Sequence, residues 1–187
     1  MKLHPTIISG CYGVGLSPRL DKRGSFVKTF QASAFRELGL ETGFLESFYS
    51  VSEPNVLRGM HFQLPPSDGA KLVYCLQGAV LDVALDLRVG SPSFARHTAF
   101  ELCAETASAA YIPSGVAHGF YTRKGPAVLI YQVSSEYDPA LDTGVLWSSL
   151  KMDWPSVTPI CSARDSNFAS LRDFVSPFRF GPAEVVA

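Results

Sequence analysis

Two of the four histidines stand where their side chains could act on a substrate. His61 lies in the segment 58–63 (Arg-Gly-Met-His-Phe-Gln), and residues 61 and 63 of a strand point to the same face. His118 follows the turn signal 113–115 (Pro-Ser-Gly), which would deliver the imidazole at the start of the next strand. An imidazole can act as a general base or as a metal ligand. The two placements predict a site inside a β-barrel.

The spacing around the histidines argues against a metal. Residues 113–118 (Pro-x-Gly-x-x-His) resemble the second element of the cupins, jelly-roll barrels that often bind a metal through histidines and a carboxylate. The first cupin element normally has a His-x-His pair, whereas residues 61–63 are His-Phe-Gln. Two histidines and a neutral amide make a poor divalent-metal site. We therefore expect no bound metal, and a metal-dependent cupin is the weakest alternative.

The elements that must position these residues read mainly as short strands. Residues 79–88 alternate in polarity, and residues 71–76 before them read as another strand, so Gln77-Gly78 is predicted to turn between the two as a hairpin. Further strands are predicted at 100–103, 109–112 and 127–134, separated by Gly- and Pro-containing turns. This pattern favours an all-β sandwich or barrel.

Helical signals are few and short. Ser33 is the predicted N-cap of a helix over 33–38, and Asp165 or Ser166 is predicted to cap one or two turns that run through 168–174. A chain of 187 residues that is 47% hydrophobic fits one domain over 1–187. We expect an extended N-terminal arm over about 1–30 and a C-terminal helical segment over about 163–187.

Composition excludes several classes of partner. Sixteen basic and seventeen acidic residues give a net charge of −1 without a basic cluster, which disfavours nucleic acid. No apolar run approaches the roughly 20 residues that span a bilayer, and the first residues lack the apolar core of a signal peptide. We expect a cytoplasmic protein that does not contact a membrane.

Several motifs taken together resemble the dTDP-4-dehydrorhamnose 3,5-epimerase family, a group of cupin-fold enzymes. They stand in the family's order and span roughly residues 20 to 170. The motifs are 21–26 (DKRGSF), 56–63 (VLRGMHFQ), 71–73 (KLV), 78–88 with Asp82 and Asp86, 90–94 (GSPSF), 112–120 (IPSGVAHGF), and Tyr131 with 136–139 (EYDP). Each motif alone would be weak, but their ordered combination is specific.

The resemblance implies a fold, a reaction and a partner. The expected fold is a cupin-like jelly-roll barrel with a few short helices, assembled as a homodimer that needs no metal or organic cofactor. The expected substrate is a nucleotide-diphosphate 4-keto-6-deoxy sugar, in which the enzyme inverts C3, C5 or both beside the C4 ketone. A hydrogen α to a ketone can be removed by an imidazole if the enolate oxygen receives a cation or hydrogen bond.

The resemblance also implies the catalytic residues. His61 matches the base, and Asp165 matches the carboxylate that orients it. Lys71 matches the cation beside the enolate oxygen, and Tyr131 matches the residue that delivers a proton from the opposite face.

A second set of residues is expected to bind the substrate. Arg23 and Arg58 are expected to hold the pyrophosphate, because a guanidinium presents paired donors to phosphate oxygens. His118, with Asp82 as its expected partner, and Tyr137 are expected nearby. The remaining substrate-binding residues are Phe26, Lys28, Glu46 and Gln63.

The chain departs from the family pattern where the nucleotide is expected. Val27-Lys28 replaces an aromatic residue and a glutamate, and Glu46 and Phe48 replace a glutamine and an asparagine. These changes leave dTDP, CDP and GDP sugars open, and the number of inverted centres is open too. If the N-terminal arm crosses to a second copy, Arg23 and Lys28 could complete that copy's site.

Two other functions compete with the epimerase. One is a sugar-nucleotide 3,4-ketoisomerase on the same barrel, which would use a histidine without needing Lys71 and Tyr131. The other is a non-catalytic cupin that binds a sugar. Retention of His61 together with Lys71 and Tyr131 favours catalysis, because a binding module has no use for an acid and a base.

Overall fold

Residues 1–181 are described by the computed structural model, and strands dominate them. The all-β prediction is therefore confirmed. The strands are β1 (Lys2–Pro5), β2 (Tyr12–Gly15), β3 (Arg19–Asp21), β4 (Gly24–Phe26), β5 (Glu46–Ser52), β6 (Leu57–Gln63), β7 (Lys71–Asp86), β8 (His97–Cys103), β9 (Ser108–Ile112), β10 (Val116–Val133) and β11 (Asp142–Gly144). The helices are α1 (Ala32–Glu37), the 3₁₀ turn η1 (Trp147–Ser149) and α2 (Ala163–Ser166).

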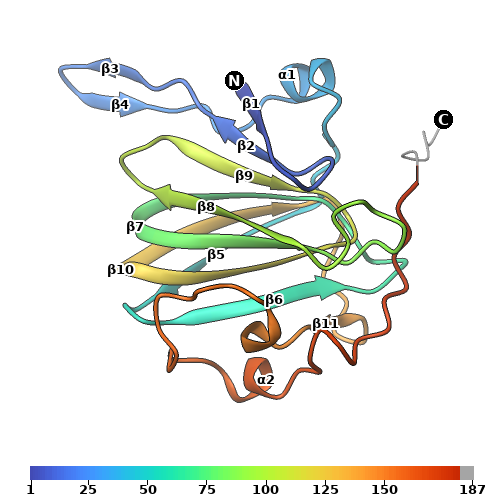
Figure 1. Ribbon diagram of the computed structural model, residues 1–187. Coiled ribbons are helices and arrows are strands. Elements are labelled where there is room, and N and C mark those ends of the chain that lie inside the picture. The colour runs from blue at the N-terminus through green and yellow to red at the C-terminus, as the bar shows by residue number, and fades with distance from the viewer. Residues whose placement is uncertain (182–187) are drawn as a thin grey trace.

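The antiparallel strands form two layers. The long strands β7 and β10 run through both layers (Figure 1). In the first layer, β1, β2 and β9 continue into residues 71–74 of β7, and β5 pairs with residues 127–133 of β10. In the second layer, β8 pairs with residues 79–85 of β7, and β6 pairs with the first half of β10 and with β11. The space between the layers is where a site can form.

β7 passes from one layer to the other at Gly78. This glycine has φ +77°, and a Cβ there would lie 2.3 Å from the Lys124 carbonyl oxygen. The pairing of β7 with β10 shifts register between Thr122 and Leu129, opposite this point. The predicted hairpin with a turn at Gln77-Gly78 is therefore wrong: one 16-residue strand bends there. Glycine allows a bend in a strand as readily as it allows a turn.

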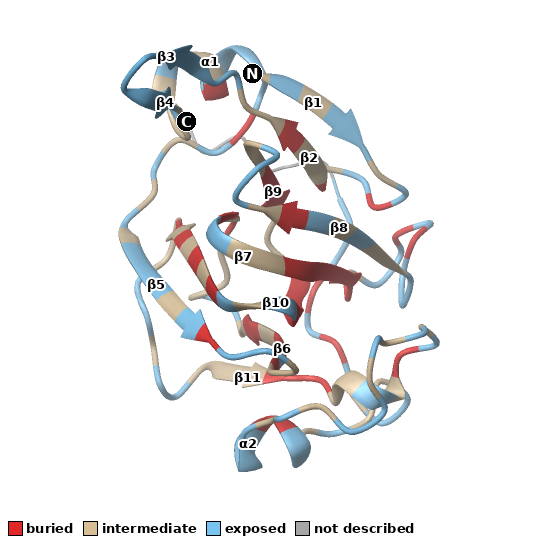
Figure 2. Ribbon diagram, turned by 90° about the vertical axis from the view of Figure 1, so that its left-hand side faces the viewer, coloured by how far each residue is buried: buried red, intermediate tan, exposed pale blue. Residues whose placement is uncertain are grey.

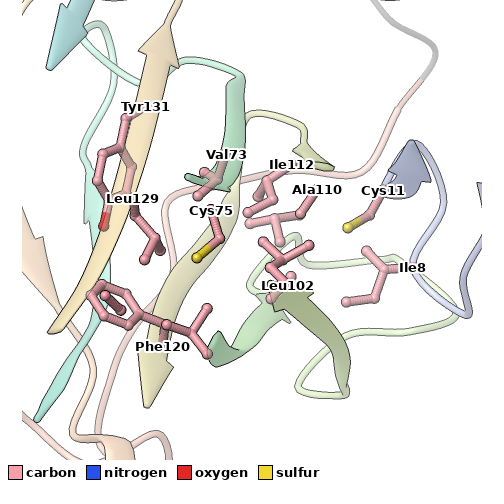
Figure 3. Packing of buried hydrophobic residues seen from close by; sticks show 14 residues of the cluster. Ile8, Cys11, Val73, Cys75, Leu102, Ala110, Ile112, Phe120, Leu129 and Tyr131 are labelled. Carbon is pink, nitrogen blue, oxygen red and sulfur yellow. The ribbon is translucent and has the colours of Figure 1, made fainter. Parts of the chain in front are cut away.

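Both faces of β7 are buried. Between the layers lie Val73 and Cys75 before the bend and Val80 and Ala84 after it, in one core cluster with side chains from β9 and β10 (Figure 3). The outer face of the first layer packs against the α1 segment, and that of the second against the C-terminal segment. Figure 2 shows this burial in the central strands. The polar face predicted for residues 79–88 is therefore buried as well.

The first predicted helix exists with another start, and the second is wrong: a short helix stands before residues 168–174 and not within them. α1 begins after Gln31, so Ser33 lies inside the helix and is not its N-cap. α2 begins after Ser162, whose side chain accepts a hydrogen bond from the Asp165 amide. Residues 168–174 form no helix, although Leu171 and Phe174 pack against the second layer as their apolar character predicted. Residues 182–187 of the predicted C-terminal segment lie outside the described residues.

The predicted N-terminal arm divides into two parts. β1 and β2 join the first layer of the same chain. The β3–β4 hairpin projects from the body of the molecule and pairs only with itself among the described strands (Figure 1). No helix within residues 1–181 has the length and apolar character needed to cross a membrane.

Candidate active site

A cavity of about 400 Å³ opens between the two layers, and each layer contributes one wall. Its side chains are polar or aromatic for the most part. The first layer supplies Glu46, Phe48, Ser50, Lys71 and Tyr131, the second supplies Arg58, His61, Gln63, His118 and Asp142, and connecting segments add Ser135, Tyr137 and Arg164. The cavity therefore gathers most of the residues that the sequence predicted for a site.

His61 carries a buried carboxylate behind its ring. Its Nε2 lies 2.9 Å from Asp165 Oδ1, and the Gly59 N–H donates to the other oxygen, Oδ2, at 3.0 Å. Burial by itself raises the pKa of the Asp165 carboxyl, but the hydrogen bonds and charge of His61, Gly59 and Ser162 hold that pKa below its ordinary value. Asp165 is thus a carboxylate at neutral pH, placed to orient the imidazole and stabilise its protonated form.

The short helix α2 brings Asp165 to this position. Ser162 is the N-cap, and its Oγ accepts a hydrogen bond from the Asp165 N–H at 3.0 Å. Asp165 is the one buried residue of α2, while its neighbours in the helix are exposed. The cap fixes where the helix starts and so which residue faces His61.

A second histidine–carboxylate pair lies next to the first. His118 pairs across the strands with His61, and its Nε2 lies 2.7 Å from Asp82 Oδ2. Asp82 is fully buried, and in the described part of the chain its Oδ1 has no hydrogen-bond partner. The predicted pairing of His118 with Asp82 is confirmed, and so is the turn at 113–115 that starts β10 at Val116.

Tyr131 faces these histidines from the first layer. Its hydroxyl lies 3.2 Å from Ser50 Oγ, its ring stacks on Phe48 with centroids 4.8 Å apart, and the His118 ring meets it edge-on at 6.0 Å. Burial raises the pKa of the Tyr131 phenol well above its ordinary value, with the Ser50 hydrogen bond opposing the shift. The phenol is therefore protonated and held in one orientation.

Lys71 places a cation beside the first pair. Its Nζ donates a hydrogen bond to the His61 carbonyl oxygen at 3.3 Å. Burial lowers the pKa of Lys71 to about 8, and the charges of Asp142 and Asp82 oppose that shift. The amine is mostly charged at pH 7 but titrates near the physiological range.

Arg58 lies at the open side of the cavity. Its Nε donates to Ser52 Oγ at 3.0 Å and its Nη2 to the Val51 carbonyl at 3.2 Å, both on β5. These bonds leave guanidinium N–H groups available to an anion.

The mouth of the cavity is built from hydrogen bonds to the backbone. Glu46 Oε2 accepts from the Tyr137 N–H at 2.9 Å, and Gln63 Oε1 accepts from the Asp138 N–H at 2.6 Å. The ring of Tyr137 is exposed at this rim.

Three of the predicted substrate-binding residues do not line the cavity of their own chain. Arg23 is exposed on the β3–β4 hairpin, where it pairs with Asp21 at 2.6 Å. Phe26 ends the same hairpin, exposed, and the Lys28 Nζ bonds the Gln31 side chain at 3.3 Å. The structure brings the other nine predicted site residues together, counting Asp165 behind His61.

Some residues of the cavity were not predicted. Asp142 and Arg164 form an ion pair of 2.7 Å in its wall, and Ser50 and Ser135 add hydroxyls. Asp142 on β11 lies opposite Gln63 on β6, and no local sequence motif predicts this strand pairing. Arg164 directly precedes Asp165, which the sequence analysis named, and this adjacency was the one available signal.

The cavity offers few metal ligands. Within residues 1–181 no group of three or more histidine, cysteine, aspartate or glutamate side chains is arranged to hold a metal ion. The Nε2 atoms of His61 and His118 are each hydrogen-bonded to a carboxylate, and the side-chain amide of Gln63 is hydrogen-bonded to the backbone.

Comparison with known proteins shows the family of this chain. The family model for dTDP-4-dehydrorhamnose 3,5-epimerase matches residues 5–173. The dTDP-4-dehydrorhamnose 3,5-epimerase of Shigella flexneri is 38% identical over 150 residues, which are 79% of this chain and 83% of that protein. The dTDP-4-dehydrorhamnose 3-epimerase of Streptomyces niveus is 38% identical over 170 residues, 89% of this chain and 82% of that protein.

A solved structure agrees as closely. The crystal structure of dTDP-6-deoxy-D-glucose-3,5-epimerase from Legionella pneumophila, in complex with dTDP-4-keto-L-rhamnose, superposes with a TM-score of 0.91 at 31% identity and covers 96% of this chain and 99% of that one. The expected cupin jelly-roll fold is thereby confirmed. The motifs, the two-layered fold and these matches lead to one conclusion: this chain is a nucleotide-sugar epimerase that belongs to the dTDP-4-dehydrorhamnose 3,5-epimerase family.

Proposed function

We propose that this enzyme inverts C3, C5 or both in a dTDP-4-keto-6-deoxy sugar, with His61 as base and Tyr131 as acid. The observation that carries the proposal is the cavity itself, in which a carboxylate-backed imidazole on one layer faces a protonated phenol and an amine on the other. Thymidine diphosphate is proposed because the relatives are named for dTDP sugars.

The first step is removal of the hydrogen next to the ketone. The free nitrogen of His61 accepts this proton, and the electron pair of the C–H bond moves into the enolate. Asp165 stabilises the imidazolium at 2.9 Å. Lys71 lies beside His61 and offers its charge to the enolate oxygen, where negative charge develops.

The second step returns a proton from the other side of the sugar. Tyr131 belongs to the opposite layer, and its raised pKa keeps the phenol protonated until a strong base such as the enolate carbon approaches. Transfer of the phenolic proton to that carbon inverts the centre. The imidazolium and the phenolate then exchange protons with solvent, which restores both groups without a cofactor.

The nucleotide is expected at the open side of the cavity. Arg58 has guanidinium N–H groups available for a phosphate, and the exposed ring of Tyr137 provides a flat apolar surface for a base. Glu46 stands at the same rim, where its charge would favour a base with an amino group over thymine. The CDP and GDP series therefore belong in any test.

We also propose a homodimer in which the β3–β4 hairpin reaches the partner's cavity. Exposed apolar side chains support it: Leu20 and Phe26 lie on the hairpin, and Tyr49 and Val51 lie on β5, a strand that within residues 1–181 is paired on one edge only. Arg23 and Lys28 would then bind the partner's substrate. The proposed domain is the whole chain, 1–187.

The decisive experiment is isotope exchange. The enzyme is incubated in deuterium oxide with matched dTDP-, CDP- and GDP-4-keto-6-deoxy sugars, and loss of the C3 and C5 proton signals is followed by NMR. We expect exchange with the dTDP sugar, none with His61→Ala, and unchanged exchange with His4→Ala, a substitution at an exposed histidine on β1. Chelators are expected to have no effect.

Other outcomes identify other functions. Exchange in the CDP or GDP series alone would reassign the nucleotide and leave the chemistry standing. Binding of a sugar nucleotide without exchange in any series would reject the epimerase and point to a ketoisomerase or a sugar-binding protein. Loss of activity with chelators would reject the cofactor-free mechanism.

A further inference from the structure

Both hydrogens of the Gln63 side-chain amide are bonded inside the protein. Its Nε2 donates to the Ser67 carbonyl at 2.9 Å and the Glu136 carbonyl at 3.0 Å, with Ser135 Oγ at 3.3 Å. Its Oε1 accepts from the Asp138 N–H at 2.6 Å. The amide has two hydrogens, so these bonds use both donors, and the bond from Asp138 uses one of the two lone pairs of Oε1. Although Gln63 lines the cavity, it has no hydrogen left to offer a substrate.

These bonds join two loops that cross between the layers. Residues 64–70 connect β6 to β7, and residues 134–141 connect β10 to β11. Gln63, the last residue of β6, bonds the main chain of both. The second loop carries Tyr137, which forms the rim of the cavity.

A second side chain holds the same loop from the other layer. Glu46, the first residue of β5, accepts the Tyr137 N–H at 2.9 Å. Three consecutive residues of the loop, 136–138, are thus bound through their main chain by Gln63 and Glu46. Tyr137 has an exposed ring, so its position depends on these backbone bonds more than on packing.

We propose that Gln63 is a positioning residue for the nucleotide end of the substrate: with Glu46 it clamps the loop 134–141 so that Tyr137 stands at the mouth of the cavity. Gln63 acts through this loop and does not touch the substrate. The proposal rests on the proposed function only in taking Tyr137 as a nucleotide contact, and it replaces the expectation that Gln63 itself binds substrate.

The clamp needs an amide at this position. A glutamate would turn both donors into acceptors that face two carbonyl oxygens, and a neutral histidine has one donor and one acceptor. A metal-binding cupin carries the second histidine of its His-x-His pair at the position of Gln63. In this chain the residue at that position binds two loops and not a metal ion. This accounts for the sequence His-Phe-Gln at 61–63.

Steady-state kinetics with a double-mutant cycle tests the clamp. We expect Gln63→Glu to raise KM for the sugar nucleotide on the order of tenfold while kcat changes less than about twofold, since the reacting groups stay in place. In a Tyr137→Ala background the same change should raise KM by less than about twofold, because the residue through which Gln63 acts is already gone. Gln77→Glu is the matched control, at an exposed position outside the cavity.

Glu46→Ala supplies an independent variant if Gln63→Glu folds poorly. This substitution removes the acceptor of the Tyr137 N–H at the exposed rim of the cavity. It is expected to raise KM as Gln63→Glu does, and to have little effect on KM in the Tyr137→Ala background. Effects of Gln63→Glu or Glu46→Ala that persist fully in the Tyr137→Ala background would overturn the proposal, because they would mean direct contact with substrate. A fall in kcat alone would overturn it too.

Amide hydrogen exchange separates this proposal from the proposed function. Gln63→Leu, whose side chain can neither donate nor accept, should increase the exchange rates of the Tyr137 and Asp138 amides at least tenfold and leave those of β7 unchanged, whether or not the enzyme turns over a sugar nucleotide. Unchanged protection at 137 and 138 would reject the clamp. If the wild-type enzyme shows no isotope exchange in any nucleotide series, the proposed function fails while this measurement still decides the clamp.

Discussion

At the scale of single residues, the state of His61 depends on Asp165. The carboxylate bonds His61 at 2.9 Å and has its pKa held low, so it favours the imidazolium that forms when a proton is taken from the sugar. We expect Asp165→Asn to lower kcat by roughly 10²–10⁴-fold, the size of a general-base contribution, with KM changed less than about threefold. Single-turnover exchange measures this.

Asp153→Asn is the matched control, because that carboxylate is exposed and lies outside the cavity. A kcat within about twofold of wild type for Asp165→Asn would show that His61 works without its partner.

The charge of Lys71 sets a limit on the alkaline side. Because burial lowers its pKa to about 8, the cation that stabilises the enolate is lost as pH rises through that value. We predict that kcat/KM falls above about pH 8, and that Lys71→Arg moves this fall upward by more than 2 pH units, since arginine stays charged. If kcat/KM of Lys71→Arg still falls above about pH 8, the fall is caused by the titration of a group other than Lys71.

The lowered pKa of Lys71 makes the protein more stable at the alkaline pH at which it makes the enzyme less active. Between the folded pKa of about 8 and the unfolded value of 10.5, the unfolded chain binds more protons, so the free energy of unfolding rises with pH over that window. Below about pH 8 the cost of burying the charged amine is fully present. Lys71→Met should remove this pH dependence in denaturant titrations.

At the scale of elements, a four-residue helix controls the geometry of the base. Ser162 caps α2 and sets the position of Asp165. Ser162→Ala is expected to cost about 1 kcal/mol of stability and to lower kcat several-fold with little change in KM. Chemical denaturation and steady-state kinetics check both effects.

Ser166→Ala is the control for the cap, because that hydroxyl bonds the Ser162 carbonyl from the exposed side of the same helix. Equal losses of kcat in the two variants would mean that the helix as a whole, and not its cap, positions Asp165.

At the scale of the whole molecule, the hairpin that carries Arg23 projects from the body (Figure 1) and supplies no residue to the cavity lining of its own chain. If it completes a partner's site, Arg23→Ala and His61→Ala are each inactive alone but complement one another. A hybrid dimer has one site with both wild-type residues, so random exchange of protomers should restore about a quarter of wild-type activity.

Mixing the two variants after reversible dissociation measures this. Arg36→Ala, on the exposed surface of α1, replaces Arg23→Ala in the control mixture and should be active without mixing. Full activity in a sedimenting monomer, or no complementation after exchange, would reject the crossed arm.

Part of the fold and part of the site could be predicted from local sequence patterns. Period-two alternation and Gly/Pro turns are properties of neighbouring residues, so the all-β class, the turn before His118 and the shared face of His61 and Gln63 could be predicted. The resemblance supplied Asp165 and Tyr131 as partners of His61, which spacing could not, because 104 residues separate Asp165 from His61.

Only the tertiary structure decided the rest, because it depends on contacts between distant segments. Gly78 reads equally as a turn or as a bend, and the strands packed against β7 on both sides select the bend. The use of Gln63 as a clamp and the entry of Asp142 into the cavity require two loops to meet at one rim. The sequence by itself determined the fold class and the chemical groups, and the packing of the two layers determined which of those groups meet.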